Sequence, residues 1–575
     1  MIINKNIRTM NTKILKGLSI IIVAICISNT GQSQNNEETN THNEQVTIIS
    51  SFDPSINQAY KVNTSPEVMT FSIDKPEFTF ESLDINQPTE ITLKPIKPVV
   101  INADKKTSTT NNSLKVGVGS LFSPYVDFFH SSGKKNDYRF DAHLYHLSSF
   151  KNIKDYSPSP QSNSTIDLNY SKFLKNHIFN AGIDYNLSTN RYYGFKPDDF
   201  PTFAPVDSDL KQSFNYVGLN VGIASNYSSK KKLSHSVVID GYYYFDKFKS
   251  NESNVNLDFD IHKNFDVTDM LDYQELGLSG KVSYFGNSNG LTSSTDIFVS
   301  ATPYFKGNYG IINFYLGLNF NILNTSNTNF YFYPIIDVNF NLIPDYLTVF
   351  VGVDGKVEKH SFYQLTQLNP WTESTTKLDW GRNFNTYGGI RGNISQKVVY
   401  SAQVSWKKFN NMFFFINIPD GTIPQLPFNK FTAIYDNGSV FGISGEVTFA
   451  ANKKVNLIAG AKYNIYSLDS ISEAYHKPSS EIKFGISALA AKKLKIWSEV
   501  YYYGKRVALD PTILPLGTTI DLDGFIDLNA GVDYQLTDSF SAFLSVTNIL
   551  NNDYQRYLNY PVHGIQLMGG ITYKF

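Results

Sequence analysis

The sequence has little cysteine, no long apolar run and almost no net charge. Cys26 is the single cysteine among 575 residues, which excludes disulfides within the chain and metal sites built on several thiolates. No apolar run reaches about 18 residues and the mean hydropathy is −0.24, which argues against a polytopic helical membrane protein. Because 50 Lys and Arg balance 51 Asp and Glu, no basic surface for nucleic acid is expected.

Aromatic residues are abundant instead. The chain contains 37 Tyr and 43 Phe, far more than a disordered protein of this length would carry. These residue types favour strands, so the composition predicts a large, aromatic-rich and mainly β protein.

The first 33 residues have the organisation of a signal peptide. An apolar core over 17–28 precedes small residues at Gly31 and Ser33, and the basic start contains Lys5, Arg8, Lys13 and Lys16. Residues 1–33 are therefore expected to be removed on export, which leaves the mature chain without cysteine. A lipoprotein that begins at Cys26 is the less favoured alternative, because Ile25 stands where a small residue is needed.

Residues 34–113 differ from the rest of the chain. They lack a helical period and are punctuated by Pro54, Pro66, Pro76, Pro88, Pro95 and Pro98. Proline fixes φ and favours extended backbone, so this segment is predicted to be an extended arm in the periplasm or in the lumen of a barrel.

From Leu114 to Phe575 apolar and polar residues alternate. In the last segment the odd positions are apolar or aromatic: Ile565, Leu567, Ile571, Tyr573 and Phe575. The same period of two recurs over 526–536, 455–465, 312–320 and 217–223. A period of two places one set of side chains on each face of a strand.

Strand length separates a soluble sandwich from a membrane barrel. Several alternating segments extend over about 10 residues or more, near the ~9–11 that cross a bilayer with tilt. Tyr and Phe cluster at segment ends (242–244, 331–333, 413–415 and 501–503), as expected for interfacial aromatic girdles. Because backbone groups in lipid must be paired, the sheet has to close. The sequence therefore predicts an all-β, antiparallel transmembrane barrel (residues 114–575) with an even number of about 16–22 strands.

Connection lengths predict the orientation. Counted from the C-terminus, long connections (550–562, 505–523, 467–479) alternate with short ones (537–538, 491–493, 451–453). Outer-membrane barrels have short periplasmic turns and longer outer loops, so both termini are expected in the periplasm. Further outer loops are predicted at 195–211 and 364–382, whereas 408–428 has no clear pattern.

The final strand carries a predicted insertion signal. Ile571, Tyr573 and Phe575 occupy alternate positions and end the chain in an aromatic residue, the pattern that barrel-assembly machinery is understood to recognise. The expected surroundings are therefore outer-membrane lipids and lipopolysaccharide.

The C-terminal sequence resembles that of TonB-dependent receptors. The resemblance rests on the stretch from Phe543 to Tyr554, on Tyr560-Pro561, on Gly564 and on the terminal Tyr573-Lys574-Phe575. The internal stretch 387–392 followed by 404–406 is also similar to strands of these barrels, and Ser33-Gln34 is typical of Bacteroidota members. This resemblance implies an outer-membrane barrel that imports a solute and contacts TonB or another outer-membrane protein or lipoprotein.

The chain departs from that family at its N-terminus. Typical members place a folded plug before the barrel, whereas here about 80 residues are available and no full plug is recognisable. One segment loosely resembles a TonB box, the strand that pairs with TonB by β-augmentation: Gln45, Val46, Thr47, Ile48, Ile49 and Ser50. The missing plug puts coupled transport in doubt.

The sequence offers little for catalysis. His143 and His146 fall on opposite faces of a strand and so cannot share a metal ion. Asp527, Asp533 and the pair Asp198-Asp199 are expected to be solvated lumen or loop charges. We find no nucleophile, zinc or phosphate motif, so no enzyme, cofactor or metal is predicted.

Three functions remain open. The favoured one is transporter-like or channel-like uptake of a small solute. The alternative is a non-transporting structural or assembly subunit of a larger outer-membrane complex, which the missing plug favours. The third, an outer-membrane enzyme, would need a site assembled from distant strands.

Overall fold

The computed structural model describes residues 111–133, 137–227, 232–265, 268–289, 292–419, 427–452, 454–512 and 518–575. The expected signal peptide, residues 34–110 of the expected arm and the TonB-box-like segment 45–50 lie outside these ranges.

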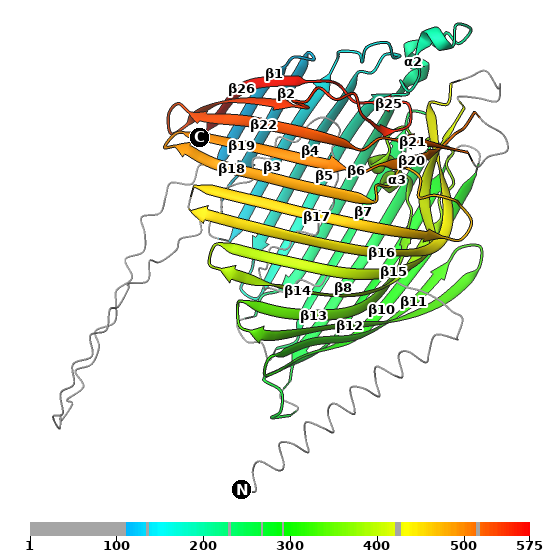
Figure 1. Cartoon of the computed structure of the whole chain (residues 1–575). Helices are drawn as coiled ribbons and strands as arrows, with labels where there is room; N and C mark the ends of the chain where they lie inside the picture. The colour runs from blue at the N-terminus through cyan, green and yellow to red at the C-terminus, as the bar shows by residue number, and fades with distance from the viewer. Residues whose placement is uncertain are drawn as a thin grey trace.

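One antiparallel sheet of 22 strands forms the wall of the molecule (Figure 1). The first strand pairs with the last, Leu114 opposite Tyr573, so the sheet closes into a barrel, as predicted. The strands in chain order are β1 (Asn112–Gly119), β2 (Ser123–Ser131), β3 (Tyr138–Ser149), β4 (Gln161–Phe173), β5 (His177–Arg191), β6 (Lys211–Ser225), β7 (Ser234–Asp246), β8 (Asn251–Asn264), β9 (Tyr273–Ser288), β10 (Ser293–Tyr309), β11 (Ile312–Asn324), β12 (Thr328–Ile343), β13 (Leu347–Lys359), β14 (Trp380–Ser395), β15 (Val398–Ile418), β16 (Lys430–Asn452), β17 (Val455–Leu468), β18 (Ser480–Ala491), β19 (Leu494–Tyr503), β22 (Phe525–Gln535), β23 (Phe540–Thr547) and β26 (Gln566–Lys574).

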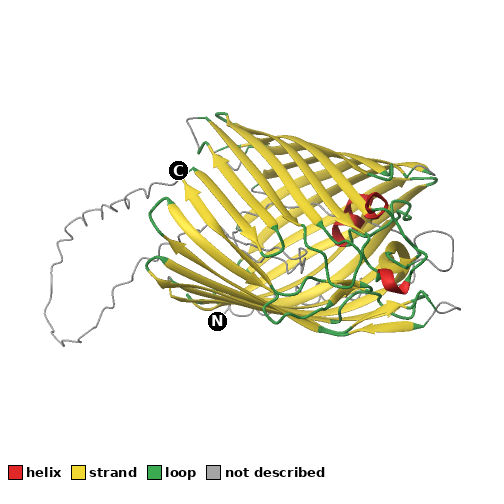
Figure 2. Ribbon diagram, turned by 90° about the horizontal axis from the view of Figure 1, so that it is seen from above, coloured by secondary structure: helices red, strands yellow, loops and turns green. Residues whose placement is uncertain are grey.

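Short elements lie in the connections. They are η2 (Pro197–Asp199), α2 (Asp207–Leu210), α3 (Phe362–Leu368), and the two hairpins β20 (Arg506–Leu509) with β21 (Thr519–Leu522) and β24 (Gln555–Tyr557) with β25 (Tyr560–Pro561). The helices gather at the end of the barrel opposite the C-terminus, together with the long loops (Figure 2). No helix in the described part of the chain is long and apolar enough to cross a membrane.

The period of two in the sequence corresponds to two faces of the wall. On β6, Val217, Leu219, Val221 and Ile223 are exposed on the outside. Phe214 on the same strand is buried inside the barrel, against Tyr244 of β7. The outer face is therefore apolar along the strand, as a lipid-facing wall requires.

The predicted alternation of connections is confirmed. The connections 453–454, 492–493 and 536–539 are short, whereas 469–479, 504–524 and 548–565 are long. The loops predicted at 195–211 and 364–382 are the connections 192–210 and 360–379. The region 408–428, which had no clear sequence pattern, contains the end of β15, where a bulge between Phe409 and Met412 interrupts the period of two.

The aromatic clusters were only partly assigned correctly. Phe332 and Tyr243 are exposed on the outside, as a girdle requires. The expectation was wrong for Phe413, Phe414 and Phe415, which are buried because β15 continues into a region covered by loops. An aromatic triplet has side chains on both faces of a strand, so it cannot contribute only to a girdle.

Candidate functional site

Three connections and one pair of strand ends meet over one mouth of the barrel and form what we call the loop cap. They are the connections 192–210, 360–379 and 548–565 and the facing ends of β15 and β16. Their buried core consists of Tyr192, Tyr193, Phe195, Leu210, Leu365, Trp371, Phe413, Phe415, Phe431, Ala433, Tyr557 and Tyr560. Connections of a barrel are usually polar, so this core makes the mouth a packed structure rather than a set of independent loops.

Trp371 lies at the centre of the loop cap and is 4% exposed. Its ring stacks on that of Tyr560, with centroids 3.9 Å apart and planes at 25°. The ring of Tyr193 meets it edge-on at 5.6 Å. The indole Nε1–H donates to the carbonyl oxygen of Arg191 at 3.0 Å, so the polar end of the side chain is satisfied as well.

Hydrogen bonds to backbone carbonyls join the same segments. Tyr193 Oη donates to Pro561 O at 2.8 Å, and Tyr557 Oη donates to Leu368 O at 2.8 Å. Asn429 Nδ2 donates to Tyr192 O at 2.9 Å, while its own carbonyl accepts from Tyr560 Oη. These contacts fix one arrangement of the segments, because each requires a particular partner backbone.

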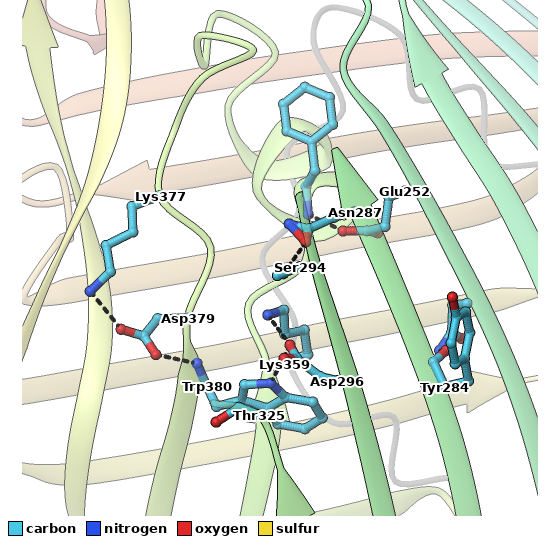
Figure 3. A network of polar contacts seen from close by, with 12 residues as sticks. Glu252, Tyr284, Asn287, Ser294, Asp296, Thr325, Lys359, Lys377, Asp379 and Trp380 are labelled. Carbon is cyan, nitrogen blue, oxygen red and sulfur yellow. Dashed lines mark hydrogen bonds and ion pairs between the residues drawn. The ribbon is translucent and has the colours of Figure 1, made fainter. Parts of the chain in front are cut away.

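The connection 360–379 descends into the barrel through α3. Ser361 caps this helix, its Oγ accepting from Gln364 N at 3.1 Å. The buried Glu252 of β8 accepts from Phe362 N at 2.7 Å, so a carboxylate of the wall lies at the N-terminus of α3 (Figure 3). Tyr244 of β7 and Thr366 share a hydrogen bond of 2.6 Å. The helix is thereby attached to the inner face of β7 and β8.

The connection 469–479 between β17 and β18 borders the loop cap, which it contacts through His476. Its Nδ1 lies 3.0 Å from Phe415 O, and its Nε2 lies 3.3 Å from Leu558 N. A carbonyl only accepts and an amide only donates, so these partners select the neutral tautomer with the proton on Nδ1. Burial lowers the pKa of His476 to about 3. Burial also lowers the pKa of the neighbouring loop residue His563, to about 4.

These histidines predict that the loop cap weakens in acid. In an opened loop the pKa of His476 returns to about 6.5. Above about pH 6.5, His476 is neutral in both the closed and the opened loop, so it adds its full stability to the closed loop cap. As the pH falls from about 6.5 toward 3, the opened loop binds a proton that the closed loop cap does not, and this stability is lost. We expect faster amide hydrogen exchange of 470–479 and 555–563 at pH 5 than at pH 7.5, after correction for intrinsic rates. The contribution of His476 to this loss of stability at pH 5 should be about 2 kcal/mol.

The variant His476→Asn is the matched control. Its side-chain amide still offers a donor in the place of Nδ1 but does not titrate, so the pH dependence of exchange should shrink. An unchanged pH profile in this variant would show that His476 does not control the loop cap.

The lumen below the loop cap is polar. His143 of β3 bridges two carboxylates, with Nε2 3.0 Å from Asp127 and Nδ1 3.2 Å from Asp167. His146 lies on the other face and contacts Ser164, as the strand geometry predicted. The described residues hold no group of three or more His, Cys, Asp or Glu that could bind a metal ion.

Two residues of the predicted insertion signal are exposed, and of the carboxylates expected to be solvated only Asp527 is buried. Ile571 and Phe575 are exposed on the outer face at the C-terminus, and Tyr573 stacks on Phe540 and Phe575. Asp198 and Asp199 are exposed in η2, as expected. The expectation of a solvated Asp527 was wrong: it is buried and accepts from Tyr554 Oη at 3.1 Å, because the connection 548–565 folds over it.

The loop cap is not predicted by the sequence patterns. A usable signal was present, because Tyr192-Tyr193, Trp371 and Tyr560 are large aromatic residues inside connections where polar residues are the rule. Their mutual contact could not be derived, since it depends on which strands close the barrel.

Comparison with known proteins gives a consistent assignment of the fold. No protein-family model matches the sequence, and no curated protein matches it. The siderophore receptor PirA from Acinetobacter baumannii superposes with a TM-score of 0.64 at 12% identity, over 82% of this chain and 81% of that one. The pyoverdine outer membrane receptor FpvA from Pseudomonas aeruginosa gives 0.61 at 14%, over 82% and 79%. The ferric-catecholate import receptor Fiu from E. coli K12 gives 0.61 at 8%, over 82% of each chain.

At such identities the shared property is the fold. The resemblance to TonB-dependent receptors that the C-terminal sequence indicated is thereby confirmed at the level of architecture. This chain has the closed 22-stranded barrel fold of outer-membrane uptake receptors.

Proposed function

We propose that the protein is an outer-membrane receptor that takes up a small solute through its barrel, with the loop cap as the gate. The observation that carries this proposal is the loop cap itself: long connections from distant parts of a receptor-type barrel pack into one aromatic core over the mouth. The short turns then lie in the periplasm with both termini, and the loop cap faces the cell exterior.

The geometry suggests how such a gate would work. The segments of the loop cap are joined by hydrogen bonds between side chains and backbone carbonyls, which can be exchanged for bonds to water or to a solute. A solute that binds the outer surface and favours separated loops shifts the population toward an open mouth. Inside, the lumen offers polar side chains to a hydrophilic solute. Coupling to TonB belongs to this proposal, whereas catalysis does not.

A disulfide lock tests the gate. Thr376 of the connection 360–379 and Thr432 of β16 have their Oγ1 atoms 3.2 Å apart, so cysteines there are close enough to bond. The mature chain is expected to lack other cysteines. We expect the oxidised T376C/T432C variant to lose most uptake and to regain it after reduction.

The assay begins by finding the solute. A deletion strain is compared with its parent for uptake of radiolabelled ferric siderophores, cobalamin and oligosaccharides, and the lock is then tested with any solute that depends on the chain. Both single-cysteine variants serve as controls under the same oxidant. Full uptake by the oxidised double variant would exclude gating by the loop cap, and a panel without any dependent solute would exclude uptake as the function.

A structural or assembly subunit is the second candidate function. The observation that favours it is the extent to which the mouth is closed, since Trp371, Tyr192 and Tyr560 are almost fully buried. Under this alternative the locked variant behaves as the wild type in every uptake assay, and loss of the chain instead lowers the amount of other outer-membrane proteins.

A further inference from the structure

Three lysines near the loop cap form no ion pair or hydrogen bond with any described residue. Lys407 of β15 and Lys462 of β17 point into the lumen, because the residues on either side of each are exposed on the outer face. Lys477 approaches from the connection 469–479, with its Nζ 4.8 Å from the centroid of the Phe413 ring. We call Lys407, Lys462 and Lys477 the lysine cluster.

The charges of the lysine cluster act on one another. Lys462 lies close enough to Lys407 and to Lys477 for its positive charge to affect both. Burial, together with this repulsion, lowers the pKa of Lys477 to about 8, so its ammonium group still carries a charge at pH 7. Like charges held together in a partly desolvated place raise the free energy of the empty site. An anion bound between them would remove this cost.

Neighbouring carboxylates are not ion-paired with the lysine cluster. Two of them pair with other lysines of the wall: Glu358 with Lys356 at 3.0 Å, and Glu446 with Lys483 at 2.6 Å. Asp354 attracts Lys407 without forming an ion pair with it. Glu481 lies opposite Lys462 in the ladder between β17 and β18, yet no ion pair in the described part of the chain joins the two. The ammonium groups are therefore available to a ligand.

A glycine of β16 separates two polar side chains between these lysines. β15, β16 and β17 lie side by side in the wall, and Gly442 is paired with Ser405 on one side and Asn464 on the other (Figure 1). A Cβ on Gly442 would lie 3.0 Å from Ser405 Oγ and 3.2 Å from Asn464 Oδ1, so the glycine leaves room for both groups. Lys407 follows Ser405 by two residues, and Lys462 precedes Asn464 by two. A hydroxyl and an amide, both possible donors, thus lie between the ammonium groups.

This combination of groups suits a phosphate better than a carboxylate. Lysine binds phosphate as a point charge, whereas planar carboxylates are best held by the rigid fork of arginine. A phosphate group carries a charge of about −1.5 to −2 at pH 7 and has three strong acceptor oxygens. Several ammonium groups with two neutral donors between them match both properties.

We propose that the lysine cluster, together with Ser405 and Asn464, binds the phosphate group of a small solute inside the barrel. The bound anion joins the connection 469–479 to the wall, because Lys477 belongs to that connection and Lys407 and Lys462 belong to strands. That the phosphate is part of the solute taken up rests on the proposed function, whereas the binding itself does not.

Equilibrium dialysis of the full chain in detergent against radiolabelled inorganic phosphate tests the site. We expect saturable binding that glycerol phosphate displaces and glycerol does not. Tighter binding of glycerol phosphate than of inorganic phosphate would identify an organic phosphate as the ligand, and the reverse order would identify free phosphate. Absence of saturable binding of both compounds would overturn the proposal.

Two lysine variants provide the matched comparison. Lys462→Gln should weaken phosphate binding by roughly tenfold or more, because a hydrogen bond to a charged group is lost. Lys281→Gln removes a lysine of β9 that lies 3.6 Å from Asp258, and phosphate binding should not change. Heat-modifiability shows that both variants are folded. Equal weakening in the two variants would mean that the overall charge of the lumen attracts phosphate, and the site would be wrong.

Uptake is measured separately, so that the two proposals can fail independently. Phosphate binding that requires Lys462, in a chain on which no uptake depends, would support this site and remove the proposed function. Uptake of a solute without a phosphate group, combined with absent phosphate binding, would remove the site and leave the proposed function.

Discussion

Replacing Leu219 by lysine should prevent stable insertion of the barrel, whereas lysine at the adjacent Asn220 should be tolerated. Leu219 lies near the middle of β6 and is 57% exposed on the lipid-facing side. A lysine at the bilayer midplane costs about 2–4 kcal/mol. The measurement is the unfolding free energy in urea after refolding into bilayers, with the heat-modifiable fraction in vivo as a second readout.

Asn220 makes this comparison a strict one. It faces the lumen directly opposite Asp240 of β7, so a lysine there gains a nearby carboxylate. Lysine at Asn529, a lumen-facing residue of β22, would be a poorer control. Asn529 Oδ1 accepts from Asn548 N at 3.0 Å, and a lysine would break that hydrogen bond. Similar losses at positions 219 and 220 would contradict the assignment of the two faces.

Replacing Trp371 by alanine should open the loop cap while leaving the barrel intact. The change removes the stack on Tyr560, the edge contact with Tyr193 and the hydrogen bond to Arg191 O. Truncation of a buried tryptophan costs about 3–5 kcal/mol. We expect rapid hydrogen exchange in 192–195, 368–373 and 557–561, with the exchange of strand amides unchanged.

Trp406→Ala is the control for this variant. Trp406 is on β15 and is 44% exposed on the outer face, so its loss removes a tryptophan of the same size without touching the loop cap. Rapid exchange of the three segments in this control too would mean that the loop cap responds to general destabilisation of the wall. Unaltered exchange in Trp371→Ala would show that the aromatic core does not hold the segments together.

Agreement between sequence and structure is best where the signal is local. The alternation over 217–223, 312–320 and 526–536 predicted which side chains face outward, because a period of two is a property of each strand alone. The alternation of short and long connections predicted which connections lie at each end of the barrel, because connection length is also a local property of the sequence. The bulge near Met412 and the buried triplet 413–415 escaped prediction, since an irregular register leaves no period to detect.

The sequence by itself determined that the chain forms a closed transmembrane barrel, which residues face lipid, and which connections are long. Tertiary structure alone decided the loop cap. The loop cap joins residues as distant as Tyr193 and Pro561, which meet only once β1 has closed on β26. Such contacts depend on the position of each strand around the whole barrel, which no local pattern encodes.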